Sequence, residues 1–328
     1  MQAPNLKKLQ QSILAGDRVA LGQAITLIES QKSADRQQAG NLMANLLEYS
    51  GRSLRIGITG IPGVGKSTFI EALGSVITSQ GKKLAVLAID PSSPHSKGSI
   101  LGDKTRMQKL AANANAFIRP SAAGGNLGGV ANKSMETILL CEAAGYDVII
   151  VETVGVGQSE VAVKNMTDVF VLLMLAGAGD ELQGIKRGIM EMADILIINK
   201  ADGDNIKPAN LAKKVYENAL HLFTPRNSGW LPTVLTCSSL TGEAVESVWQ
   251  KLNDFQSLLQ VGDLFDNNRN QQKKQWLEQT LVTEMMQRIK GDEKVKMSLP
   301  ELEQQVIANK ITATQAVDEV MRAFFSNK

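Results

Sequence analysis

The sequence has 328 residues, of which 43% are hydrophobic and 21% are charged, and 35 Lys and Arg against 33 Asp and Glu leave a formal net charge of +2. This composition is typical of a soluble globular protein with one large domain and appendages or with two domains, and the charge balance favours neither nucleic acid nor an anionic membrane as a partner. The N-terminus has no apolar segment behind its lysines, and no later apolar run approaches the length of a membrane span, so we expect a cytoplasmic protein.

Residues 1–50 predict a helical segment in front of the main domain. Asp17 is a candidate N-cap for a helix whose apolar residues recur on one face, and Ser33 is a candidate N-cap for a second helix. Gly51 then interrupts the pattern.

Between residues 51 and 261, short apolar runs alternate with helical patterns. The runs predict strands at 55–59, 84–89, 147–151, 169–175, 195–198 and 233–236. Apolar runs without polar alternation are typical of strands that are covered on both faces. Their alternation with helices predicts an α/β fold with a doubly wound, mostly parallel sheet, whose chemistry lies at the carboxyl ends of the strands.

The first predicted strand leads into a G-x-x-x-x-G-K-[ST] sequence followed by a helical pattern. Its residues are Gly60, Ile61, Pro62, Gly63, Val64, Gly65, Lys66, Ser67 and Thr68. Glycines in such a loop let backbone N–H groups point at phosphate oxygens, while Lys66 would reach the β and γ phosphates and Ser67 would bind Mg²⁺. A glycine-rich turn without a ligand is the alternative, and the matching strand and helix on either side disfavour it.

Asn199-Lys200-Ala201-Asp202 directly follows the predicted strand 195–198. The Asp202 carboxylate can accept two hydrogen bonds from the N1–H and 2-amino group of guanine, a donor pair that adenine lacks. We therefore expect Asn199, Lys200 and Asp202 to bind the base. A weaker second base contact is predicted after the next strand, with a helix cap formed by the serine pair as the alternative, and its residues are Ser238, Ser239 and Leu240.

Strand 147–151 leads into Glu152 and, three residues later, Gly155. A carboxylate in this place can hold Mg²⁺ through water, and the Gly155 N–H can sense a γ-phosphate. Val156 stands where Ras-like proteins have a water-orienting Gln, so slow intrinsic hydrolysis is expected until another group positions the water.

Three further segments near strand ends are rich in glycine or in proline and serine. Asp90 and Asp103 in the first, 90–107, are candidate Mg²⁺ or water-orienting carboxylates, although a solvated charge or a helix cap is the alternative for each. Segments 122–129 and 176–187 could be ordered by a γ-phosphate and so create a surface for a partner, or merely connect elements.

Residues 262–328 predict a helical tail. Leu277 and Leu281 begin an apolar stripe, a capping box is expected at Ser298, and Val317 begins a last stripe. These stripes pack either on the chain's own core or on a second copy. Cys141 and Cys237 have no C-x-x-C spacing, so both are expected to be reduced, buried thiols.

Taken together, GIPGVGKST, DPSSP with GSILGDKTRM, ETVGVGQSE, AGAGDELQGIKRG, NKAD and CSSLTGE resemble the methylmalonyl-CoA mutase-associated GTPases of the MeaB or ArgK type. The resemblance spans about residues 17 to 260. It implies a homodimer that binds and hydrolyses GTP with Mg²⁺, and a chaperone for an adenosylcobalamin-dependent acyl-CoA mutase, with residues 262–328 as the dimerisation arm. It also implies that Asp90, Asp103 and Glu152 surround the metal and phosphates, and that Lys186 is a partner-ordered activating charge.

Two other functions remain as alternatives. A P-loop kinase acting on a small molecule or a transport protein is compatible with the phosphate loop, although no strong acceptor site is visible. A GTPase that delivers nickel would need Cys or His metal ligands, and the sequence has only two of each.

Overall fold

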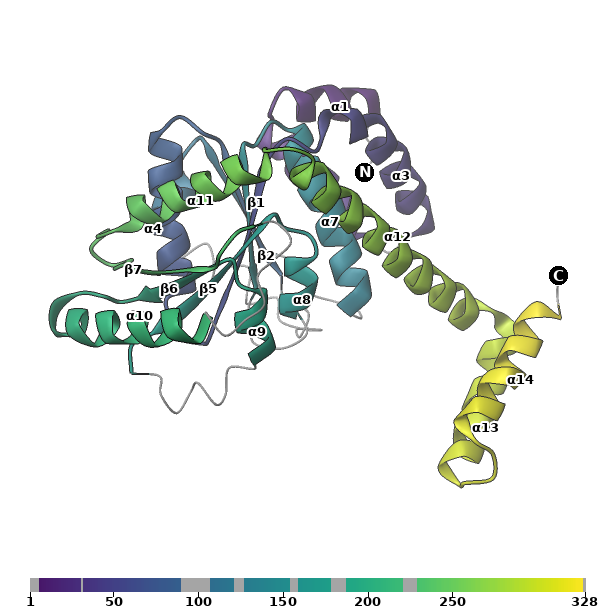
Figure 1. Ribbon diagram of the computed structural model, residues 1–328. Coiled ribbons are helices and arrows are strands. Elements are labelled where there is room, and N and C mark those ends of the chain that lie inside the picture. Colours follow the sequence, from purple (N-terminus) through teal and green to yellow (C-terminus); the bar gives the residue numbers. More distant parts are fainter. Residues whose placement is uncertain are drawn as a thin grey trace. The chain divides into compact units, whose positions relative to one another are not determined.

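The computed structural model describes residues 6–30, 32–89, 107–120, 127–153, 159–177, 187–220 and 229–326. The chain divides into two compact units, Met1–Lys273 and Lys274–Lys328, which are described separately below. The first unit holds the helical N-terminal segment and the α/β sheet (Figure 1). The domain boundaries predicted from the sequence, after residues 50 and 261, remain predictions.

Among the described residues, a seven-stranded sheet forms the centre of the first unit, with strand order β3-β2-β4-β1-β5-β6-β7 and parallel pairing throughout (Figure 1). The strands are β1 (Leu54–Gly60), β2 (Leu84–Ile89), β3 (Ala116–Pro120), β4 (Val148–Thr153), β5 (Val169–Leu175), β6 (Ile195–Asn199) and β7 (Thr233–Thr236). The predicted α/β class and strands are confirmed, but β3 was not predicted. It is a short edge strand that contains Arg119 and Pro120, so its apolar run is too brief to stand out.

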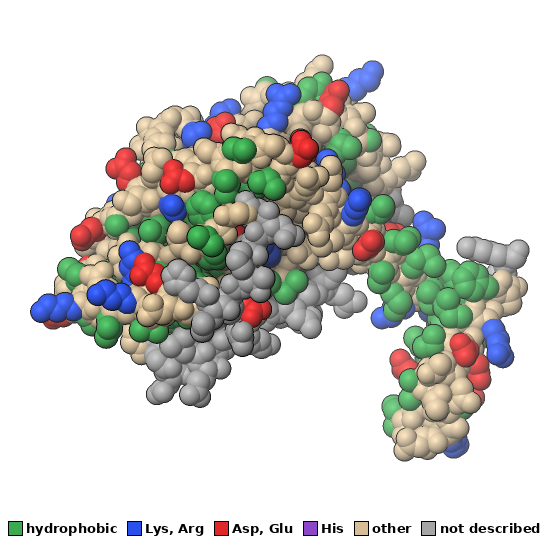
Figure 2. All heavy atoms as spheres, viewed as in Figure 1, with side chains coloured by type: hydrophobic (Ala, Val, Ile, Leu, Met, Phe, Trp, Pro, Cys, Tyr) green, Lys and Arg blue, Asp and Glu red, His purple; other side chains and the backbone are tan. Residues whose placement is uncertain are grey.

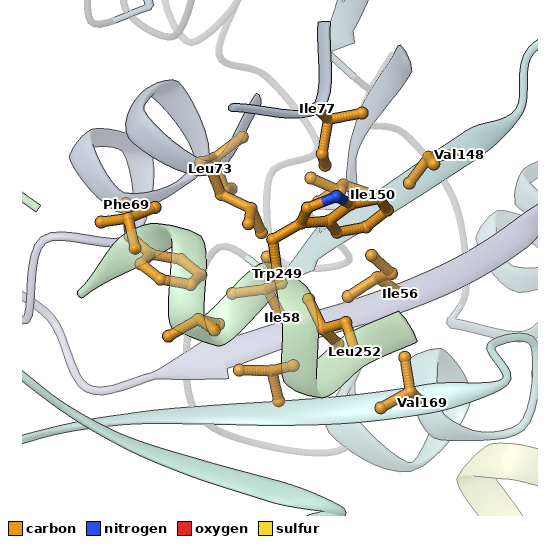
Figure 3. Close-up of a cluster of buried hydrophobic side chains, with 14 of the residues drawn as sticks. Ile56, Ile58, Phe69, Leu73, Ile77, Val148, Ile150, Val169, Trp249 and Leu252 are labelled. Atoms are coloured by element: carbon orange, nitrogen blue, oxygen red, sulfur yellow. The ribbon is translucent and has the colours of Figure 1, made fainter. Parts of the chain in front are cut away.

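Helices cover both faces of the sheet. In the first unit, the helices that follow the N-terminal segment are α4 (Lys66–Ser79), α6 (Gln108–Ala112), α7 (Leu127–Ala143), α8 (Ser159–Lys164), α9 (Arg187–Met192), η2 (Gly203–Asn205), α10 (Ile206–Leu220), α11 (Val245–Leu259) and the start of α12 (Leu264–Gly291). Strand residues alternate between the two faces with period two. Ile56 and Ile58 point to α4 and α11, where Trp249 fills the centre of the buried cluster (Figure 3).

The N-terminal segment forms α1 (Leu6–Leu14), α2 (Arg18–Glu29), α3 (Ser33–Leu46) and η1 (Leu47–Tyr49). Asp17 caps α2 as predicted, because its side chain accepts hydrogen bonds from the N–H groups of Val19 and Ala20. The predicted Ser33 cap is wrong: Ser33 is the first helical residue, and Lys32 occupies the N-cap position without a side-chain bond.

The second unit contains the remainder of α12 with α13 (Glu293–Ile307) and α14 (Ala313–Phe325). The capping box expected at Ser298 is also wrong, since α13 starts at the Asp292 cap and continues through Pro300. A capping box does form at Thr312, which exchanges hydrogen bonds with Gln315 at the start of α14. Within the described residues of the whole chain, every helix is too short or too polar to cross a membrane.

Candidate nucleotide-binding site

The phosphate loop connects β1 to α4 at the carboxyl edge of the sheet. Gly60 and Gly65 are required there by close contacts. A Cβ at Gly60 would lie 2.7 Å from the carbonyl oxygen of Leu173, and one at Gly65 would lie 2.9 Å from Nδ2 of Asn199. Gly65 also has a φ of 94°, in the left-handed region that disfavours other residues. The sequence pattern therefore reflects a loop that is tightly enclosed by β5 and β6.

The loop ends at the first turn of α4. The first helical bond runs from the Phe69 N–H to the Gly65 carbonyl, so the N–H groups of Lys66, Ser67 and Thr68 belong to the turn that has no acceptor within the helix. Such N–H groups and the positive end of the helix dipole favour an anion. The geometry of a phosphate site is thus present in the backbone itself.

Lys66 curls back over this loop. Its Nζ donates to the Gly60 carbonyl at 2.7 Å and to the Ile61 carbonyl at 3.4 Å. Burial lowers the pKa of Lys66, while the nearby carboxylates of Glu152 and Glu160 oppose that shift. The ammonium group is consequently held beside the loop that would receive a phosphate.

Glu152 lies at the carboxyl end of β4, opposite Ile58 of β1 in the strand register, and is buried. The next residue, Thr153, donates its hydroxyl to Thr59 at 2.8 Å and so joins the ends of β4 and β1. Glu160 in α8 is fully buried and was not predicted as a site residue. In the sequence it is the last residue of the ETVGVGQSE motif, eight positions after Glu152, and only the fold brings it near Lys66.

Asn199 connects the two halves of the site. Its Nδ2 donates to the Val64 carbonyl of the phosphate loop at 2.8 Å. Its Oδ1 accepts from the N–H and hydroxyl of Ser239 at 3.1 and 2.6 Å, and from the Cys237 thiol at 3.7 Å. Burial raises the pKa of Cys237 to about 12, so the thiol stays a neutral donor. Asn199 thereby fixes the phosphate loop, β6 and the loop after β7 to one another.

Asp202 is half-buried beside Ser238, whose hydroxyl donates to Oδ2 of Asp202 at 2.5 Å. The Ala201 N–H donates to the Cys237 carbonyl at 3.0 Å, which holds the two predicted base loops together. Lys200 has a φ of 58° and an exposed side chain, whose Cε would lie 4.0 Å from a Cβ at Gly65. Leu240 is 82% exposed. A carboxylate, a lysine stem and the phosphate loop are therefore adjacent.

Four predicted residues, Asp90, Asp103, Gly155 and Lys186, lie outside the described residues. Of the predicted metal ligands, Ser67 and Glu152 are described, and both offer the oxygen donors that suit Mg²⁺. The described parts of the chain contain no group of three or more His, Cys, Asp and Glu side chains that could hold a metal ion.

Comparison with known proteins agrees with this geometry. The family model described as "Methylmalonyl Co-A mutase-associated GTPase MeaB" matches residues 21–294. The chain belongs to the MeaB family. It is 46% identical to a "Putative GTPase" of Caulobacter vibrioides over 322 residues, which cover 98% of both chains. It is 42% identical over 329 residues to the mouse "Methylmalonic aciduria type A homolog, mitochondrial", covering 97% of this chain and 79% of the mouse protein.

Among solved structures, the MeaB-family chain resembles a "LAO/AO transport system kinase", with a TM-score of 0.77, 35% identity and coverage of 98% and 99% of the two chains. The family membership and the homologues named as GTPases identify the chain as a P-loop GTPase related to methylmalonyl-CoA mutase function. GTP hydrolysis is its reaction.

Proposed function

We propose that this MeaB-family GTPase is a chaperone for an adenosylcobalamin-dependent acyl-CoA mutase, which it assembles and protects and whose cofactor loading it gates. Hydrolysis of GTP would mark the end of each gating cycle. The proposal places the protein in the cytoplasm, acting as a homodimer. The observation that carries its nucleotide dependence is the pairing of Asp202 with Ser238 beside the Asn199 link to the phosphate loop.

This pairing supports guanine selection through geometry. Ser238 engages Oδ2 of Asp202, which limits rotation of the carboxylate and leaves its remaining acceptor capacity for the base. Asn199 holds that same loop to Val64, so the base and the phosphates would be bound at a set separation. Recognition of the base would then be coupled to the position of the triphosphate, as a gating protein requires.

Mg²⁺ would be held by the Ser67 hydroxyl and, through water, by Glu152, and when bound it would neutralise charge on the β and γ phosphates. Lys66 would stabilise negative charge on the same oxygens. We assign Asp90 and Asp103 to the metal and water, Gly155 to the γ-phosphate, and Lys186 to an activating charge supplied when the partner binds. The assignments of Asp90, Asp103 and Lys186 rest on the family resemblance, and that of Gly155 rests on its place three residues after Glu152.

Self-association is supported by the surface of the second unit. Hydrophobic side chains gather on it in Figure 2, and several large ones are exposed. They are Leu277, Leu281, Val282, Met286, Met297, Ile307, Val317 and Phe325. Exposed apolar residues at this density favour an interface over a solvated surface, and a second copy of the chain is the occupant we propose.

Calorimetric titration with GTP and inosine triphosphate tests the base assignment. Inosine lacks the 2-amino group, so we expect GTP to bind about 10 to 100 times more tightly, the effect of one hydrogen bond to a charged group. Equal affinities would remove Asp202 as the selector of guanine.

A second experiment tests the partner. GTP hydrolysis should be slow for the protein alone and should accelerate at least about tenfold, or about 1.4 kcal/mol, when a purified methylmalonyl-CoA mutase is added. The control is a cobalamin-independent acyl-CoA enzyme. The proposal fails if both additions give the same rate, and transfer of labelled γ-phosphate to a small molecule or transport protein would instead support a kinase.

A further inference from the structure

The first turns of α12, residues 264–273, are attached to the sheet mainly through polar side chains; we call this segment the α12 root. Arg269 and Gln272 are the buried residues of the entire helix, while Leu264 and Phe265 are partly buried against the apolar core. Gln272 donates from Nε2 to the Thr167 carbonyl at 2.8 Å. A helix with so little apolar burial depends on these polar contacts for its attachment.

Arg269 joins three separate parts of the first unit. Its Nε and Nη2 donate to the two carboxylate oxygens of Asp168, each at 2.7 Å. Nη2 also donates to the Ser53 carbonyl at 2.7 Å, and Nη1 donates to Glu142 at 3.2 Å. Ser53 precedes β1, Asp168 precedes β5, and Glu142 belongs to α7. One guanidinium group therefore connects the root to the beginnings of two neighbouring strands.

Asp168 and Glu142 are shared with a second arginine. Oδ2 of Asp168 accepts from the Arg55 N–H of β1 at 2.8 Å, and the Arg55 guanidinium makes two bonds to Glu142, at 2.9 and 2.8 Å. All four residues are at most 5% exposed. Two positive and two negative charges thus neutralise one another in a closed network.

An ionic network is not the least costly way to attach a helix. Burying charges removes them from water, and an apolar contact of similar volume is often equally or more stable. A bidentate arginine–carboxylate pair, however, requires one relative position of its partners, whereas apolar side chains tolerate sliding. The network therefore contributes a specific docking geometry to the root.

That geometry bears on the nucleotide site through the strands themselves. β1 runs from the network directly to the phosphate loop, and β5 runs beside it to Leu173, whose carbonyl closely approaches Gly60. The opposite ends of one strand pair therefore carry the Arg269 network and the phosphate loop. A displacement of β1 relative to β5 at one end of the pair would therefore change their relative position at the other end.

We propose that Arg269 is a positioning residue that couples docking of the α12 root to nucleotide binding: the docked root stabilises the arrangement of β1 and β5 that binds guanine nucleotide, and bound nucleotide holds the root docked. The inference rests on the proposed nucleotide function. Reciprocity is required by thermodynamics, because two sites that are coupled must affect each other by the same factor.

Hydrogen exchange on the full chain, with and without GDP and Mg²⁺, tests this coupling. We expect GDP to slow amide exchange in residues 265–273 by about fivefold, the lower end of typical coupling, in the unmodified protein. Arg269→Met should abolish that slowing and weaken GDP binding by about the same factor. Arg269→Lys keeps the charge but not the paired bonds, and should restore part of both effects.

The matched control is Arg288→Met, which removes an exposed arginine from the last turn of the same helix. It should leave the GDP-dependent slowing and the GDP affinity unchanged. GDP that binds without altering exchange in the root would overturn the coupling, as would an Arg269→Lys variant indistinguishable from the unmodified chain. Failure of the unmodified chain to bind GDP would instead overturn the proposed function. If Arg269→Met does not fold, Arg269→Lys decides alone.

Discussion

The sheet has a carboxyl edge, where its parallel strands end, and an amino edge, where they begin. Polar side chains at these two edges differ in burial and in bonding. At the carboxyl edge, Lys66 and Asp202 are half-buried, and each contacts its neighbours through only part of its bonding capacity. At the amino edge, Arg55 and Arg269 are almost fully buried. The guanidinium of Arg55 is bonded to Glu142, and that of Arg269 is bonded to both Asp168 and Glu142. The same two strands, β1 and β5, run from one edge to the other.

This difference separates a binding site from an anchor. A group that must receive a ligand keeps access to solvent and bonding capacity to spare, whereas a structural charge is worth burying only when its partners satisfy it. Substitutions of the half-buried Lys66 and Asp202 are therefore expected to change chemistry with little change in stability. Substitutions at the amino edge should do the reverse.

The largest effect is expected for Asp202→Asn. The amide can no longer accept two hydrogen bonds from guanine, so preference for GTP over xanthosine triphosphate should fall by about 10⁴. Competitive binding of the two nucleotides measures this, and the unfolding midpoint should be nearly unchanged. A variant that keeps its preference for GTP would contradict the role of Asp202.

Lys66→Ala should lower the single-turnover rate of GTP hydrolysis by about 10³, because the ammonium group no longer stabilises charge on the phosphates. Lys214→Ala, which removes an exposed lysine from α10, is the control and should hydrolyse GTP normally. Equal rates for the two variants would show that Lys66 has no part in the reaction.

Asp168→Asn tests the amino edge. It leaves Arg269 without its paired carboxylate, and the free energy of unfolding should fall by about 3 kcal/mol. Urea unfolding measures the loss, and Asp254→Asn, which affects an ion pair exposed to solvent, should cost less than about 1 kcal/mol. Similar losses for both variants would mean that the buried network contributes no more to stability than an exposed ion pair does.

Acid should reduce the stability that the charged network at the amino edge contributes. Burial alone would raise the pKa of Glu142, but hydrogen bonds and charge from Arg55, with Arg269 and the Gly51 N–H, outweigh it and hold the pKa below its ordinary value of 4.5. Ionised Glu142 therefore contributes stability above that pH, and the contribution is lost as pH falls through the folded-state pKa. In the Glu142→Gln variant, the free energy of unfolding, measured from neutral to acidic pH, should depend less steeply on pH than in the unmodified protein.

The smallest effect is expected at the thiols. Cys141 and Cys237 are buried, and burial raises the pKa of both. Neither should react with an alkylating reagent at neutral pH in the folded protein, whereas both should react in denaturant, as mass spectrometry can show. Rapid labelling of Cys237 in the folded state would mean that the loop after β7 opens.

Much of the carboxyl edge was predictable because its chemistry is local in sequence. A phosphate loop needs glycines, a lysine and a hydroxyl in one short run, and the base loop directly follows an apolar strand. The short strand β3 and the start of α13 were missed, since neither an edge strand containing proline nor a helix that continues through Pro300 has a distinctive local pattern.

The sequence by itself determined the α/β class, most of the strands and the residues that would bind a nucleotide, because apolar periodicity and a contiguous loop record them in neighbouring positions. Only the tertiary structure decided that Asn199 holds Val64, that Glu160 is buried near Lys66, and that Arg269 reaches the starts of β1 and β5. The physical reason is separation along the chain. Arg269 and Ser53 are 216 residues apart, and no local pattern can indicate which distant charge will satisfy a buried one.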